Sequence, residues 1–162
     1  MSKTPTLSDQ DMDIIFRTAR TYNGWKDQDV SDVMLESIFE LMKWGPTSAN
    51  CSPLRIKFLK SQEQKEKLKP FLMEGNQDKT MAAPAVAILA RDLEFYEHLP
   101  KLFPHTDAKS WFEGNDDLIH ETARRNATLQ GGYFIIKGKE KVIISQEIKV
   151  NNSVYINESP DD

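Results

Sequence analysis

The sequence has a single cysteine and no excess of basic residues. Cys51 has no second thiol with which to form an internal disulfide or a cysteine-rich zinc site, and one reduced thiol fits a cytoplasmic location. The 21 Lys and Arg residues are outnumbered by 25 Asp and Glu residues, which gives a net charge of −4. Such a surface offers no basic track for a phosphate backbone, so nucleic acid is not expected as a partner.

Long hydrophobic runs and the common catalytic motifs are also missing. The longest apolar run, residues 81–90, is far shorter than a membrane span, and the N-terminus has no signal-peptide pattern, so no membrane partner is expected. No G-x-S-x-G, Walker A, H-E-x-x-H or G-x-G-x-x-G pattern occurs. His98, His105 and His120 lack metal-ligand spacing and are interpreted as exposed or half-buried histidines, so no metal site is predicted.

What the sequence does contain is the composition of one globular domain. At 162 residues, with 39% hydrophobic and 28% charged residues, the chain can bury a core but is too short for two full domains. All eight Phe and all three Trp residues precede residue 138. We therefore expect a folded domain over residues 1–137 and a divergent tail over residues 138–162.

Apolar spacing and cap residues predict four helices. They span about residues 8–19, a stretch from Asp32 to just before Gly45, residues 61–72, and residues 116–137. Gly75-Asn76 is expected to stop the third helix from continuing. Ser31 is the expected N-cap of the second helix, whose apolar stripe is formed by Met34, Ile38, Leu41 and Met42. The last helix carries a small-residue face for a core or dimer interface, formed by Ala123, Ala127 and Gly131.

Two strands are predicted between these helices. Residues 55–60 alternate around Ile56 and Phe58, and residues 83–90 are apolar on both faces, which favours a strand buried in the middle of a sheet. Residues 92–115 are rich in aromatic residues, proline and glycine, and are expected to form an irregular lid or subunit contact. The helices and stripes together predict a homodimer.

Residues 45–53 form a loop of small and polar residues between the second helix and the first strand. Thr47, Ser48, Asn50 and Ser52 offer hydroxyls and an amide that suit the polar edge of a heteroaromatic ring, although a plain connecting loop is also a good interpretation. Cys51 is either a nucleophile or, more often for a lone cysteine, a packed thiol. Arg20 and Lys79 are each either phosphate ligands or solvated charges.

Three segments of the chain resemble the nitroreductase superfamily. They are residues 20–25, 30–32 and 42–53. Residues 95–105 and 108–112 contribute further to the resemblance. Within that superfamily, the branch resembled contains the malonic semialdehyde reductases of pyrimidine degradation and proteins known as NADH dehydrogenase/NAD(P)H nitroreductases. The resemblance covers about residues 8–136.

This resemblance implies an α+β fold, with a central, mostly antiparallel sheet flanked by helices in an intertwined homodimer. It implies FMN bound at the subunit interface and reduced by NADH or NADPH in a ping-pong cycle. The expected activity is reduction of a small aldehyde, malonic semialdehyde to 3-hydroxypropionate, with nitro compounds or quinones as surrogate small-molecule substrates. No side chain is predicted to act as a nucleophile, because the flavin performs the redox chemistry.

The resemblance also implies the cofactor-binding residues. The motif that holds the FMN phosphate and ring edge falls on Arg20, Thr21 and Asn23. The loop that crosses to the flavin of the other subunit falls on Pro46, Thr47, Ser48, Asn50 and Ser52. An Asn-x-x-Lys pair that reaches the flavin ring falls on Asn76 and Lys79.

The resemblance ends after residue 136. Relatives continue into further strands and a helix, none of which is legible in residues 138–162, so the C-terminal part is expected to be incomplete. Lys149 alone resembles the closing lysine that binds the FMN phosphate. The alternative function is therefore a flavin-less remnant that acts only as a dimerising or binding module.

Overall fold

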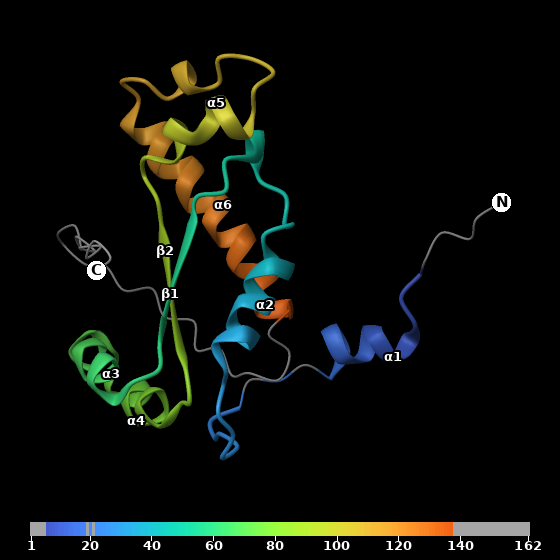
Figure 1. Ribbon diagram of the computed structural model, residues 1–162, viewed down its shortest axis with the longest axis vertical. Helices are drawn as coiled ribbons and strands as arrows, with labels where there is room; N and C mark the ends of the chain where they lie inside the picture. The colour runs from blue at the N-terminus through green and yellow to red at the C-terminus, as the bar shows by residue number, and fades with distance from the viewer. Residues whose placement is uncertain (1–5, 19, 21, 138–162) are drawn as a thin grey trace.

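The computed structural model describes residues 6–18, 20 and 22–137, and the expected tail over residues 138–162 lies outside them. In the described residues, six α-helices and five short helical turns surround one two-stranded antiparallel sheet (Figure 1). The predicted α+β class is confirmed. No helix in this part of the chain combines the length and the hydropathy of a membrane span.

The sheet is a hairpin whose two strands are joined by two helices. β1 (Leu54–Leu59) pairs with β2 (Val86–Arg91), with Leu54 opposite Arg91 and Leu59 opposite Val86. Both predicted strands therefore exist, within three residues of the expected bounds. The prediction that the second strand is buried in mid-sheet is wrong for the described chain, because β2 pairs only with β1 there and is half-buried to exposed.

The two N-terminal helical segments begin at serine caps. Ser8 forms a capping box with Asp11 at the start of α1 (Asp9–Met12), which continues as the π-helical turn η1 (Asp13–Arg17). The Ser31 hydroxyl accepts from the backbone N–H of Met34 and caps α2 (Asp32–Met42) as predicted.

The buried face of α2 differs from the predicted stripe. Leu35, Ile38 and Met42 are buried, whereas Met34 and Leu41 are 40% and 53% exposed. The predicted stripe is therefore correct at Ile38 and Met42, whereas Leu35, at i, i+3, i+7 spacing with these two, takes the buried place expected for Met34. Met34 and Leu41 thus leave apolar surface on the outside of α2.

The segment between the strands also differs from prediction. α3 (Gln62–Leu68) starts at a Ser61–Gln64 capping box and continues into the turn η3 (Lys69–Phe71). The break comes at Leu72, whose backbone is extended, and Gly75 and Asn76 lie inside α4 (Glu74–Ala82). Pro70 has no backbone N–H to continue the hydrogen bonds of α3, so the helix ends there and not at Gly75 as predicted.

Residues 92–115 are folded into short helical turns rather than an irregular excursion. These are η4 (Phe95–His98), α5 (Leu99–Leu102) and η5 (Lys109–Trp111). Phe95 and Leu99 are fully buried, and the Phe95 ring meets the Phe112 ring edge-on at 4.9 Å between centroids. The aromatic residues of this segment build a core of their own.

The long helix α6 (Asp116–Lys137) has the predicted bounds and connects two hydrophobic clusters. Ala123 packs with Phe95 and Phe112 in one cluster, and Phe134 packs with Ile38 and Met42 of α2 in the other. A Cβ at Gly131 would lie 3.4 Å from the Leu89 side chain of β2. The small-residue face is therefore used inside the protomer, against the hairpin and α2.

One buried charge fixes the far end of the hairpin. Lys65 of α3 is 6% exposed, and its Nζ donates to the carbonyl oxygens of Met81 and Ala83, each at 2.9 Å. These carbonyls lie at the C-terminal end of α4, where a helix leaves acceptors unpaired and favours a cation. Lys65 thus joins α3 to the end of α4, just before β2.

Replacing this lysine tests the importance of the link. We expect Lys65→Met to lower the free energy of unfolding by about 1–3 kcal/mol, because two buried carbonyls lose their donor. The matched control is Lys67→Met on the same helix, because the Lys67 side chain is 74% exposed and pairs with Glu63. Urea unfolding monitored by circular dichroism measures both variants, and equal losses would contradict the role given to Lys65.

Candidate functional site

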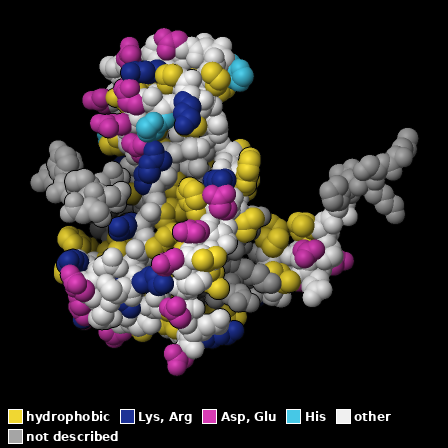
Figure 2. All heavy atoms as spheres, viewed as in Figure 1, with side chains coloured by type: hydrophobic (Ala, Val, Ile, Leu, Met, Phe, Trp, Pro, Cys, Tyr) yellow, Lys and Arg dark blue, Asp and Glu magenta, His cyan; other side chains and the backbone are white. Residues whose placement is uncertain are grey.

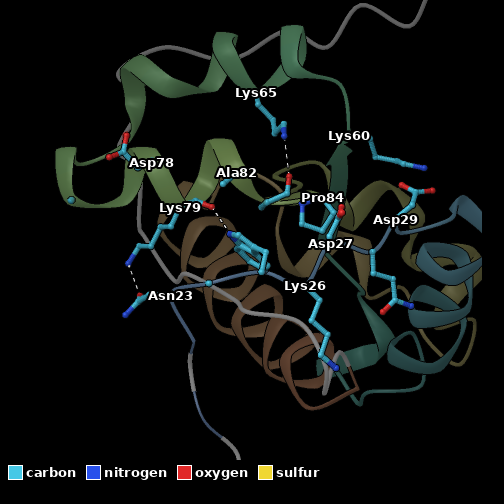
Figure 3. Close-up of a pocket in the computed structure, with 15 residues that line it drawn as sticks. Asn23, Lys26, Asp27, Asp29, Lys60, Lys65, Asp78, Lys79, Ala82 and Pro84 are labelled. Carbon is cyan, nitrogen blue, oxygen red and sulfur yellow. Dashed lines mark hydrogen bonds between the residues drawn. The ribbon is translucent and has the colours of Figure 1, made fainter.

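A pocket of the described structure lies at the α3–α4 end of the hairpin (Figure 3). Its volume is about 1020 Å³, and its walls come from residues 23–29, from α4 and from the turn into β2. Lys26, Lys60, Lys65 and Lys79 line it together with Asp27, Asp29 and Asp78. The pocket is therefore highly charged but carries both signs.

Two predicted site residues meet in this pocket. The Lys79 ammonium of α4 donates to the Asn23 side-chain oxygen at 3.3 Å, and Figure 3 shows the two side chains pointing toward each other. The Trp25 indole N–H donates to the Lys79 backbone carbonyl at 2.7 Å, which fixes residues 23–25 against α4. Residues 56 positions apart are thus brought to one place.

Two other predicted residues, Asn76 and Arg20, are not among those that line the pocket. Asn76 is half-buried on α4, one helical turn before Lys79 and on the same side of the helix. The exposed Arg20 guanidinium donates to the Arg17 carbonyl at 3.3 Å, and Arg20 is not a pocket residue. Thr21 lies outside the described residues.

The predicted loop, residues 45–53, lies at the other end of β1. Ser48, Ala49 and Asn50 form the turn η2 (Ser48–Asn50), and Ala49, Asn50 and Ser52 have φ values of 48°, 52° and 40°. Three non-glycine residues in the left-handed region within four positions are an uncommon concentration of backbone strain, which is typical of functional loops.

Local hydrogen bonds shape this loop from within. The Thr47 hydroxyl accepts from the Ser52 backbone N–H at 3.1 Å, and the Asn50 amide donates to the Leu102 carbonyl of α5 at 3.2 Å. A Cβ on the buried Gly45 would lie 2.9 Å from the Tyr133 ring of α6, so this close approach requires glycine. Pro46 is exposed at the start of the loop, and Ser48 and Asn50 are exposed within it.

Two side chains of α6 hold the loop backbone, and neither was predicted to have a role. Asn126 accepts from the Ser48 backbone N–H at 2.8 Å, and Gln130 accepts from the Leu54 backbone N–H at 3.0 Å. Both are buried, with exposures of 3% and 4%. The signal that was available is their i, i+4 spacing on an otherwise small or apolar helix face, since a buried amide must find a partner.

Cys51 and the histidines do not form a reactive centre. Burial raises the pKa of the Cys51 thiol, and the hydrogen bond with Thr47 offsets this effect only in part. A buried thiol of raised pKa is a packed residue, so the nucleophile interpretation is disfavoured. The three histidines are exposed, and no group of three or more His, Cys, Asp or Glu side chains within the described ranges could hold a metal ion.

The pocket and the loop are separated by the length of the hairpin. The loop precedes Leu54 and the pocket follows Leu59, and six residues of β-strand span roughly 17 Å. Figure 1 shows α3 and α4 at one end of the hairpin and α5, next to the loop, at the other. The predicted site residues therefore form two groups, which one protomer does not bring together.

Comparison with known proteins shows the family of the chain. The nitroreductase family profile matches residues 17–136. A Burkholderia lata protein named for NADH dehydrogenase and NAD(P)H nitroreductase activity is 55% identical over 134 residues, which are 83% of this chain and 69% of that protein.

Two solved structures share the fold at low sequence identity. A nitroreductase homologue from Bacillus subtilis has a TM-score of 0.71 at 20% identity, covering 80% of this chain and 70% of that one. A nitroreductase homologue from Exiguobacterium sibiricum, solved in complex with FMN, has a TM-score of 0.70 at 18% identity, covering 86% and 74%. The expected nitroreductase-like fold is confirmed, and this chain belongs to the nitroreductase family.

Proposed function

We propose that this protein is an FMN-dependent NAD(P)H oxidoreductase that works as a homodimer, with each flavin held between two subunits. The observation that carries the proposal is the meeting of Lys79 and Asn23 in a pocket of about 1020 Å³. Pockets for small molecules commonly measure about 300–1,000 Å³ and combine a large volume with a few convergent polar groups.

The residues present fit a flavin. The Lys79 ammonium and the Asn23 amide supply donors and an acceptor from two different elements, and the ring edge of a flavin carries both kinds of group. Asn76 is the neighbouring polar group on α4. In this proposal Arg20 and Thr21 serve the phosphate. Pro46, Thr47, Ser48, Asn50 and Ser52 of the partner subunit's loop serve the opposite side of the ring.

The separation of the two groups supports a second copy. A single protomer keeps the pocket and the loop about 17 Å apart along β1, which exceeds the reach of hydrogen bonds to one ring. Exposed apolar side chains on η1, on α2 and the turn that follows it, and on α6 offer surface for a partner, among them Phe16, Val33, Leu41, Trp44 and Leu129. Figure 2 shows hydrophobic side chains gathered in the middle of one face, with charged groups around them.

Bound FMN supplies the redox chemistry, since it accepts a hydride from NADH or NADPH and passes reducing equivalents to a second substrate. The protein's own contribution is binding and charge. Lys79 puts a positive charge in the pocket, which favours electron uptake by a flavin there. Malonic semialdehyde, reduced to 3-hydroxypropionate, is the proposed substrate, on the strength of the branch that residues 42–53 resemble.

The first experiment tests the flavin and the dimer. We expect the purified protein to absorb in the flavin bands, to have twice the 18.6 kDa chain mass by light scattering, and to oxidise NADH or NADPH when malonic semialdehyde is added. A quinone or nitro compound serves as the surrogate acceptor. A colourless dimer that does not bind added FMN would instead favour the flavin-less binding module.

A mixed dimer tests whether each site is shared between subunits. We expect Lys79→Met and Asn50→Leu homodimers each to bind FMN weakly, by roughly 5- to 150-fold for one unpaired polar group. A heterodimer of the two variants, isolated with two affinity tags, should regain one tight site, because one pocket and one loop remain intact. FMN titration counts the sites; if the heterodimer gains none, each site lies within one protomer.

Replacing Arg20 tests the phosphate end. We expect Arg20→Ala to weaken FMN binding by roughly 10- to 150-fold, the effect of one charge-assisted hydrogen bond, and to leave riboflavin binding unchanged. Arg17→Ala is the matched control, because Arg17 pairs with Asp13 on the protein surface. Flavin fluorescence measures all three proteins, and equal weakening of riboflavin would assign Arg20 to the ring or to the fold.

A further inference from the structure

The loop at residues 47–54 holds a backbone shape that its own sequence does not favour. Ala49, Asn50 and Ser52 all have positive φ, and none is a glycine. Such conformations persist where the surroundings determine them. The bonds inside the loop, from Ser52 to Thr47 and from Cys51 to Ser48, connect residues that move together, so they do not anchor the loop to the rest of the molecule.

The Asn50 amide ties the loop to the Leu102 carbonyl of α5, and two further side-chain anchors come from the middle of α6. Asn126 binds the loop at Ser48, before the strained residues, and Gln130 binds it at Leu54, after them. The Asn126 amide also donates to the Thr122 carbonyl at 2.9 Å, which orients its oxygen toward Ser48. The two bonds therefore bracket the strained segment and tie both of its ends to one rigid helix.

Both side chains are too deeply buried to act on a ligand directly. They are 3% and 4% exposed, whereas Ser48 and Asn50 of the loop are exposed. The Asn126 oxygen accepts from the Ser48 backbone N–H in the loop, and the Gln130 oxygen accepts from the Leu54 backbone N–H at the start of β1. Their chemistry is thus directed at the loop and not at solvent.

We propose that Asn126 and Gln130 are positioning residues, which hold the 48–52 loop in the one shape that meets a flavin of the partner subunit. The proposal rests on the proposed function for its ligand. Its structural half, the restraint of the loop, stands independently of any ligand. Neither residue contacts the cofactor; both act through Ser48 and Asn50.

Hydrogen exchange on the ligand-free protein tests the restraint. Asn126→Leu and Gln130→Met remove the acceptor at similar volume, and we expect at least about tenfold faster exchange at the Ser48 and Leu54 amides, respectively. Asn126→Asp and Gln130→Glu keep an acceptor oxygen in either protonation state and should retain protection. Thr128→Val on the exposed side of α6 is the control. Unchanged exchange in the Leu and Met variants would overturn the proposal.

A double-mutant cycle with Asn50→Leu tests the action through the loop. We expect Asn126→Leu and Asn50→Leu each to weaken FMN binding about tenfold. If Asn126 acts only through the loop, the double variant also stays near tenfold, instead of the hundredfold expected for independent sites. A hundredfold loss would overturn the proposal. If the parent protein binds no FMN, the proposed function fails, and the exchange experiment still decides whether α6 restrains the loop.

Discussion

The length of the β1–β2 hairpin is the constraint on which the arrangement of the site depends. Six paired residues per strand hold the 45–53 loop and the α3–α4 pocket at opposite ends, and no side chain can span that distance. α6 and the aromatic cluster around Phe95 support the loop, whereas Lys65 and Trp25 support the pocket.

Each end is secured by a buried polar side chain that satisfies backbone groups. Lys65 donates to carbonyls at the end of α4, and Asn126 and Gln130 accept from N–H groups of the loop. In a low-dielectric interior such bonds are strong, and the unpaired group that their loss leaves behind is costly. Apolar packing alone would leave these backbone groups unpaired, so polar side chains define where the chain turns.

Local sequence signals predicted the elements well and their surroundings poorly. The serine cap at Ser31 and the full extent of α6 follow from residues adjacent in the chain. The placement of Gly75 inside α4 and the exposure of β2 do not, because they depend on Pro70 ending the previous helix and on what covers a strand face. For the same reason the loop could be singled out from sequence, whereas Asn126, more than 70 residues away, could not.

The Lys79–Asn23 contact is compatible with the proposed binding of an acceptor in the pocket. An ammonium group carries three donors, so Lys79 can keep its bond to Asn23 while another N–H turns to a carbonyl or ring nitrogen. Trp25 holds the Lys79 backbone in place during such a change, because its bond is to the main chain and does not involve the ammonium. The Lys79 side chain can therefore adjust while its backbone stays fixed, which is the arrangement that binding with little reorganisation requires.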